Sequence, residues 1–222
     1  MTSVHRKPFV IAIDGPAAAG KGTLARRIAE HYGFAYLDSG SLYRAVALAL
    51  LEAGRDPHDE EAAVAAARTL DPAILTRPDL RREDVGEAAS IVAAMPAVRE
   101  ALLAFQRDFA RHPPAGAPGV VIDGRDIGTV VCPDADIKLY VTASDAERAR
   151  RRQRELAGRG EAVDFATVLA DLRRRDERDA SRATAPLKPA DDAVLLDTTE
   201  MDIDAVFAAA RRIIDSRLQA RM

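Results

Sequence analysis

The chain has 222 residues, of which 48% are hydrophobic and 30% are charged, a composition typical of a globular protein with one main core. Its formal net charge is −3, which excludes the strong positive field that favours nucleic acid polymers or anionic membranes as partners. A single cysteine excludes a disulfide within the chain, and residues 1–8 lack the apolar run of a signal peptide. We expect a cytoplasmic protein that acts as a monomer.

Five short apolar segments are typical of buried parallel strands: residues 9–14, 35–38, 120–123, 137–141 and 193–197. Helical patterns lie between them, and this alternation predicts an α/β fold with a five-stranded parallel sheet. Ligands of such sheets gather at the carboxyl ends of the strands, where Asp14, Asp38 and Asp123 lie.

The chain is expected to divide into a core, an insert and a lid. Residues 57–113 show helical patterns but no strand, which indicates an inserted helical subdomain. An arginine-rich hairpin at 148–162 is predicted to be a short lid, and its first helix opens with the capping box Ser144-Asp-Ala-Glu147. The core then comprises residues 1–56, 114–147 and 163–222.

The most informative motif lies in residues 9–23, where an apolar run leads into I-D-G-P-A-A-A-G-K-G-T and then a helical pattern. Glycines let backbone N–H groups turn toward a phosphate, the helix adds the positive end of its dipole, and Lys21 adds a full charge. An ordinary glycine-rich turn is the alternative, but it does not explain a lysine between two glycines. The candidate residues for the ATP phosphates are Gly15, Pro16, Ala17, Ala18, Ala19, Gly20, Lys21, Gly22 and Thr23.

Magnesium is the expected cofactor, with no ligand assigned with certainty. Gly22, not Ser or Thr, follows Lys21, and this G-K-G-T variant resembles the nucleoside monophosphate kinases. The resemblance implies that Mg²⁺ is held mainly by nucleotide phosphates and water, close to Asp14 or Asp123. Asp123 ends an apolar strand and begins D-G-R-D, which suits a magnesium-bound water. The same cluster could instead be a structural ion pair.

Arginines crowd residues 148–159 and 173–182. They fit a solvated helix face with acid partners, such as Asp171 with Arg175, or a lid that places positive charge on a transferring phosphate. RNA binding is a third interpretation, which the scarcity of aromatic residues and the acidic net charge disfavour.

Five motifs together resemble the cytidylate kinase family of P-loop nucleoside monophosphate kinases over nearly the whole chain. They are I-D-G-P-A-A-A-G-K-G-T (13–23), L-D-S-G-S-L-Y-R (37–44), V-R-E-A-L-L (98–103), D-G-R-D-I-G-T-V-V (123–131) and R-D-E-R-D-A-S-R-A-T-A-P-L (175–187). The resemblance implies a three-layer P-loop fold and phosphoryl transfer from ATP to CMP and dCMP in pyrimidine nucleotide metabolism. One departure is the stretch 71–83, which is too short for the small sheet of the family's insert.

The resemblance also implies site residues. Ser90, Arg99 and Asp126 match positions that read the cytosine edge, while Asp179 with Arg175 matches the sugar-hydroxyl site. The implied CMP-binding residues are Ser39, Arg44, Ser90, Arg99, Arg125, Asp126, Arg175, Asp179 and Arg182. The implied catalytic residues are Lys21, Arg125, Arg151, Arg152 and Arg182.

Two other functions remain open at this point. A P-loop kinase for UMP or AMP would keep the phosphate-binding residues, but it leaves the match at the three base-reading positions unexplained. A non-catalytic nucleotide-responsive binding protein would keep the P-loop with a broken acceptor site. The presence of Arg44, Arg125, Asp179 and Arg182 argues against it.

Overall fold

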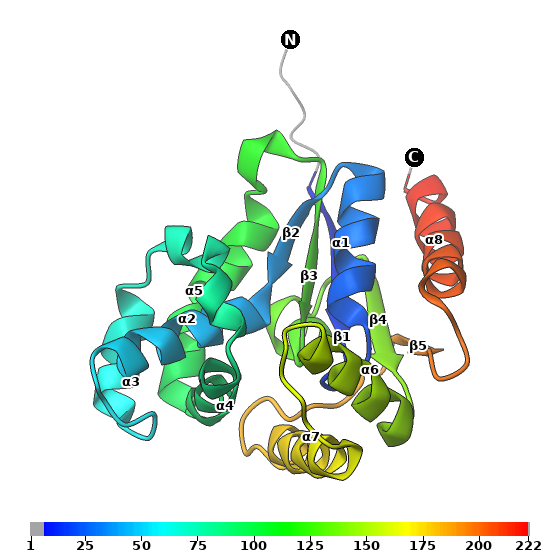
Figure 1. Ribbon diagram of the computed structural model, residues 1–222. Coiled ribbons are helices and arrows are strands. Elements are labelled where there is room, and N and C mark those ends of the chain that lie inside the picture. The colour runs from blue at the N-terminus through cyan, green and yellow to red at the C-terminus, as the bar shows by residue number, and fades with distance from the viewer. Residues whose placement is uncertain (1–6, 222) are drawn as a thin grey trace.

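The computed structural model describes residues 7–221. The prediction that residues 1–8 are not a signal peptide therefore falls mostly outside the described residues. Five parallel strands form one sheet in the order β2-β3-β1-β4-β5 (Figure 1). The strands are β1 (Phe9–Asp14), β2 (Ala35–Asp38), β3 (Gly119–Gly124), β4 (Ile137–Thr142) and β5 (Val194–Asp197). All five predicted strands are present, each within one residue of its expected ends. The expected burial is wrong for β5, where Val194 and Leu195 are exposed because this strand lies at the edge of the sheet.

Helices cover both faces of the sheet and give the predicted three-layer arrangement. Val10 and Ala12 of β1 face a core shared with α2 (Ser39–Glu52) and α5 (Pro96–Arg111). Ile11 and Ile13 face the opposite core, which α1 (Lys21–Tyr32) and α8 (Ile203–Gln219) complete. Because both faces are buried, β1 is a continuous apolar run and not an alternating one.

The stretch between α2 and β3 contains no strand in the described structure, as predicted. It consists of α3 (Glu60–Arg68), short 3-10 turns at Pro72–Thr76 and Pro78–Arg81, α4 (Glu83–Val92), α5 and a further 3-10 turn at Pro114–Gly116. The two turns at 72–81 occupy most of the stretch 71–83, which was predicted to be too short for a small sheet. Val85 and Val98 belong to the same apolar core as Val10 of the sheet. The insert is therefore packed on the sheet.

Two helices, α6 (Asp145–Ala157) and α7 (Phe165–Ala180), lie at the end of the sheet where the strands end (Figure 1). Their apolar side chains, including Ala149, Leu156 and Leu172, form a small core with Ala17. Ala17 belongs to the glycine-rich loop of residues 15–23 between β1 and α1, which we call the P-loop. This packing holds both helices beside the phosphate-binding loop.

The predicted capping box of α6 is only half formed. The Ser144 hydroxyl accepts a hydrogen bond from the Glu147 N–H at 3.3 Å, as a cap should. The Ser144 N–H, however, donates to the Thr199 hydroxyl at 2.9 Å and not to Glu147. The Glu147 carboxylate pairs instead with arginines of its own helix, because three of them lie within reach: Arg150, Arg151 and Arg154.

Within residues 7–221, no single helix is long and apolar enough to cross a membrane. The segments Glu83–Val92 and Pro96–Gly116 reach that length and composition only when taken together, and they are bent by 100° against each other.

Candidate active site

The loop between β1 and α1 has a backbone that requires glycine at two points. Gly15 has a φ of +151°, and a Cβ there would overlap the carbonyl oxygen of Val141 in β4. Gly20 has a φ of +89° and is the N-cap of α1, which begins at Lys21. A tightly wound loop that runs directly into a helix N-terminus is the arrangement that binds phosphate groups.

Lys21 lies buried in the first turn of α1, where its Nζ donates to the Pro16 carbonyl at 3.2 Å. Burial, followed by the nearby Arg125 guanidinium, lowers the pKa of Lys21 to about 7. A phosphate beside the ammonium group would favour its charged form and raise this pKa again.

Asp123 ends β3 close to the P-loop. Its Oδ1 accepts a hydrogen bond from the Tyr36 hydroxyl at 2.8 Å, and its Oδ2 lies 3.8 Å from the place a Cβ would take at Gly22. Burial and the neighbouring Asp38 carboxylate raise the pKa of Asp123 to about 6, so a cation here would relieve the repulsion. This donor set fits a hydrated Mg²⁺.

The other magnesium candidate, Asp14, has both carboxylate oxygens engaged. They accept hydrogen bonds from the backbone N–H groups of Ile127 at 2.8 Å and Gly128 at 2.7 Å. The residue is 4% exposed, and burial raises its pKa to about 6. No group of three His, Cys, Asp or Glu side chains between residues 7 and 221 could hold a metal ion, so Mg²⁺ would need phosphate oxygens and water as ligands.

A pocket at the carboxyl ends of the strands brings together all the residues predicted to bind CMP. Its lining includes Ser39, Arg44, Ser90, Arg99, Arg125, Asp126, Arg175, Asp179 and Arg182. Tyr43 of α2 also lines it, with its ring centre 5.4 Å from the Arg99 guanidinium carbon. The sequence analysis missed Tyr43, because an aromatic residue in an apolar helix also suits an ordinary core position.

One end of the pocket holds a buried ion pair between Arg99 and Asp126. Arg99 also donates to the Ala93 carbonyl at 3.1 Å, which fixes the direction of its guanidinium. The hydroxyl of Ser90 in α4 is buried nearby and has no hydrogen-bond partner within the described structure. A buried polar atom without a partner is costly, so a ligand that reaches it would gain a hydrogen bond.

The other end of the pocket is rich in arginines. Asp179 of α7 accepts from Arg125 Nε at 2.9 Å and also pairs with Arg182. The Nε of the half-buried Arg175 is itself buried and has no partner among the described residues. Desolvation, followed by Arg125, lowers the pKa of Arg175 to about 10. Arg44 also lines this pocket. This excess of positive charge suits a phosphate group, which arginine binds with two parallel hydrogen bonds.

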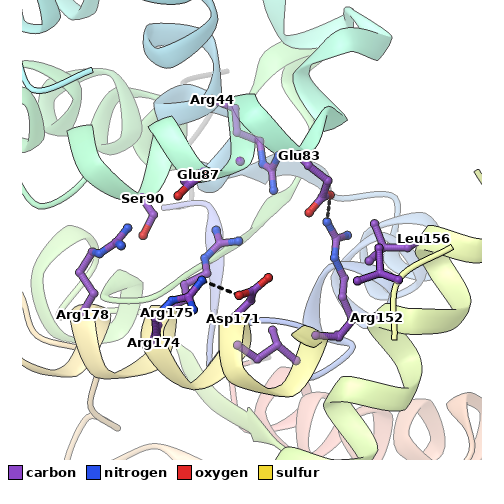
Figure 2. A pocket seen from close by; sticks show the side chains of 14 residues that line it. Arg44, Glu83, Glu87, Ser90, Arg152, Leu156, Asp171, Arg174, Arg175 and Arg178 are labelled. Carbon is purple, nitrogen blue, oxygen red and sulfur yellow. Dashed lines mark hydrogen bonds and ion pairs between the residues drawn. The ribbon is translucent and has the colours of Figure 1, made fainter. Parts of the chain in front are cut away.

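A wider cavity of about 280 Å³ opens between α4 and the helices α6 and α7 (Figure 2). Arg152 of α6 extends across this space to pair with Glu83 of α4. Asp171 pairs with Arg174 at 2.5 Å, so the predicted pair with Arg175 is wrong. Three-residue and four-residue spacings both bring side chains together on a helix, and here Arg175 faces the CMP pocket.

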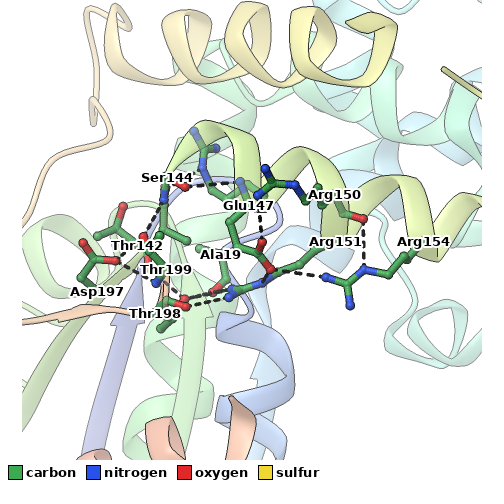
Figure 3. Close-up of polar contacts among 12 residues, drawn as sticks. Ala19, Thr142, Ser144, Glu147, Arg150, Arg151, Arg154, Asp197, Thr198 and Thr199 are labelled. Atoms are coloured by element: carbon green, nitrogen blue, oxygen red, sulfur yellow. Dashed lines mark hydrogen bonds and ion pairs between the residues drawn. The ribbon is translucent and has the colours of Figure 1, made fainter. Parts of the chain in front are cut away.

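Arg151, predicted to contact the transferring phosphate, is engaged by the protein (Figure 3). It donates to Glu147 at 3.1 Å, to the Thr198 hydroxyl at 2.9 Å and carbonyl at 2.7 Å, and to the Ala19 carbonyl at 3.4 Å. The buried Arg148 donates to the Ala17 carbonyl at 3.2 Å. Both arginines therefore join α6 to the P-loop, a contact that no local pattern in the sequence indicates.

The comparisons with known proteins agree with this geometry. The family model for cytidylate kinase matches residues 11–216. A cytidylate kinase of Methylocella silvestris is 60% identical over 208 residues, which are 94% of each chain, and one of Brucella suis biovar 1 is 58% identical over 98% of each chain. A crystal structure of an uncharacterized protein from Eubacterium ventriosum, 17% identical, matches with a TM-score of 0.55 over 95% of this chain and 99% of that one, which supports the fold alone. With a family model that matches residues 11–216 and relatives of this identity along its length, the chain belongs to the cytidylate kinase family.

Proposed function

We propose that the chain transfers the γ-phosphoryl group of ATP to CMP and dCMP, giving ADP and CDP or dCDP. Its family supports the reaction. The observation that carries the choice of acceptor is one pocket lined both by Ser90, Arg99 and Asp126 and by a group of arginines. A nucleoside monophosphate likewise combines a base that needs donors and acceptors with a phosphate that needs positive charge.

At the base end, the donors and acceptors suit cytosine. Asp126 and Ser90 accept hydrogen bonds from the exocyclic amino group, and Arg99 donates to the ring carbonyl and N3. UMP would turn a carbonyl oxygen toward the Asp126 carboxylate and leave polar groups unpaired, at a cost of about 1–3 kcal/mol for each group. The pocket therefore favours CMP over UMP.

At the phosphate end, Arg44, Arg125 and Arg182 hold the acceptor phosphate, while Asp179 and Arg175 contact the sugar. An oxygen of the CMP phosphate attacks the γ-phosphorus, the bond to the bridging oxygen breaks, and ADP leaves with that electron pair. The attacking oxygen is already ionised at neutral pH, so no general base is needed. The protein contributes alignment and positive charge.

The donor side of the reaction rests on the P-loop. Residues 15–23 bind the ATP phosphates, and Lys21 contacts the β- and γ-phosphates. We also propose Mg²⁺ as cofactor, held by ATP phosphates and by water molecules close to Asp123, since both oxygens of Asp14 are already engaged. When bound, the ion would neutralise charge on the phosphate oxygens.

We further propose that residues 57–113 form the CMP-binding insert and residues 148–162 a lid that closes over the phosphates. The ion pair between Arg152 and Glu83 supports this division, since it spans the cavity between them. For Arg152 to contact the transferring phosphate, it must leave Glu83. Cytoplasmic location and action as a monomer stay predictions.

The test is ADP release from ATP and Mg²⁺ with CMP, dCMP, UMP or AMP as acceptor. We expect turnover with CMP and dCMP and little with the other two. Efficient turnover of UMP or AMP would contradict the base assignment while keeping the fold and the chemistry. No turnover with any acceptor, despite ATP binding, would favour the non-catalytic nucleotide-responsive protein.

A further inference from the structure

Asp126, which faces the cytosine in the proposed function, occupies an unusual position in the chain. It directly precedes the π-helical turn Ile127–Val131, whose hydrogen bonds run from Val130 and Val131 back to the Asp126 carbonyl. An aspartate at the start of such a turn commonly accepts hydrogen bonds from the N–H groups that follow it. Asp126 makes no such bond, and its carboxylate pairs with Arg99 in the pocket.

Asp14 takes over the missing contacts. Its two oxygens accept from the N–H groups of Ile127 and Gly128 at 2.8 and 2.7 Å, although Asp14 lies in β1 and is 113 residues away along the chain from Ile127. Ile127 and Gly128 supply the first two N–H groups of the turn. The hydrogen bonds within the turn leave these two groups without partners. Both bonds are buried, so losing them would leave unpaired N–H groups inside the protein.

We propose that Asp14 is a positioning residue for cytosine recognition, an inference that rests on the proposed function. By satisfying the Ile127 and Gly128 N–H groups, Asp14 leaves the Asp126 carboxylate free to face the base. Without it, the carboxylate that directly precedes these groups in the chain is that of Asp126. If the Asp126 carboxylate rotated toward the Ile127 and Gly128 N–H groups, it would move away from Arg99 and from CMP.

The structure also gives this contact a second consequence. Asp14 directly precedes Gly15, so one carboxylate joins the start of the P-loop to the loop that carries Arg125 and Asp126. This contact adds to the pairing of β1 with β3, which already aligns the two loops from Phe9 to Asp14.

The experiment compares four full-length proteins: wild type, Asp14→Asn, Asp126→Asn and the double variant. For each, kcat and KM are measured with CMP and with UMP, together with the KM for ATP. An asparagine offers one acceptor oxygen where two N–H groups need partners. We expect Asp14→Asn to reduce the preference for CMP over UMP about tenfold or more, the size expected for one hydrogen bond to a charged group. The KM for ATP should change less than about twofold. Partial unfolding would lower kcat for both acceptors equally, so it cannot produce the change in the ratio of kcat/KM values.

The double variant tests whether Asp14 acts through Asp126. If it does, the double variant matches Asp126→Asn alone, because the effects of coupled residues are not additive. Multiplying effects, or an unchanged preference in Asp14→Asn, would overturn the proposal. If Asp14→Asn fails to fold, Asp14→Ser takes its place, since its shorter side chain also leaves the two N–H groups without their carboxylate.

Asp136→Asn is the matched control. Asp136 is also a carboxylate that accepts from a β1 backbone N–H, that of Val10 at 2.8 Å, but it lies outside the pocket. It should lower the melting temperature without changing the preference for CMP. Turnover of CMP by the wild type tests the proposed function separately. If the wild type does not turn over CMP, the proposed function is wrong. The role of Asp14 is tested only by comparing the CMP-to-UMP preference of the variants.

Discussion

Replacing Ser90 by alanine should affect ligand binding and stability in opposite directions. The Ser90 hydroxyl is buried at the base end of the pocket and has no partner among the described residues. A hydrogen bond from CMP to this oxygen is expected to contribute about 0.5–1.5 kcal/mol, so its loss should raise the dissociation constant of CMP about 2–13-fold. The same hydroxyl costs the free protein desolvation energy, so Ser90→Ala should leave the free energy of unfolding unchanged or raise it by up to about 1 kcal/mol.

Calorimetric titration with CMP and urea unfolding of the free protein measure the two quantities. Thr129→Val is the matched control, because the Thr129 hydroxyl is also buried without a partner in residues 7–221 but does not line the CMP pocket. It should leave the affinity for CMP unchanged. Weaker CMP binding in both variants, or a clear loss of stability in Ser90→Ala with unchanged affinity, would refute the reasoning.

Two further predictions concern the charged groups. Arg182→Ala should lower kcat/KM for CMP on the order of a thousandfold, because an arginine on a phosphate in transfer contributes that much. The free energy of unfolding of this variant should fall only about 1–2 kcal/mol, since Asp179 keeps its hydrogen bond to Arg125. Arg173→Ala, at an exposed position of the preceding helix α7, serves as control. Lys21, with a pKa of about 7, is partly neutral in the free protein near neutral pH, so ATP binding at about pH 8 should take up protons. Calorimetric titrations with ATP in buffers of different ionisation enthalpy measure this proton uptake. The uptake should vanish at about pH 5.5 and in Lys21→Arg. Equal uptake in Lys21→Arg would exclude Lys21 as its source.

The sheet and the P-loop could be predicted because their signals are local. The strands are short apolar runs separated by helical patterns, and burial on both faces makes the run of β1 continuous. The P-loop depends on glycines and a lysine at fixed spacing within residues 15–23. The pocket residues came from the family's motifs, and the parallel sheet brings those motifs to one edge.

Contacts between distant parts of the chain could not be predicted in this way. In the sequence, Arg151 is one of several arginines of the predicted lid. Its partner Thr198 lies 47 residues further along the chain, so no local pattern indicates their contact. Asp14 was a magnesium candidate on its position at a strand end, but the fold brings Ile127 to it across 113 residues. The choice between Arg174 and Arg175 as partner of Asp171 depended on which side chain faced the pocket, and helical spacing alone allows both.

The central claim is that the pocket beside the P-loop recognises the cytosine of a nucleoside monophosphate. Calorimetric titration of the nucleotide-free protein with CMP and with UMP tests it most directly, because it requires neither ATP nor turnover. The account predicts that CMP binds at least about tenfold more tightly than UMP, from one or more polar groups left unpaired with uracil. Equal affinity for the two nucleotides would contradict it.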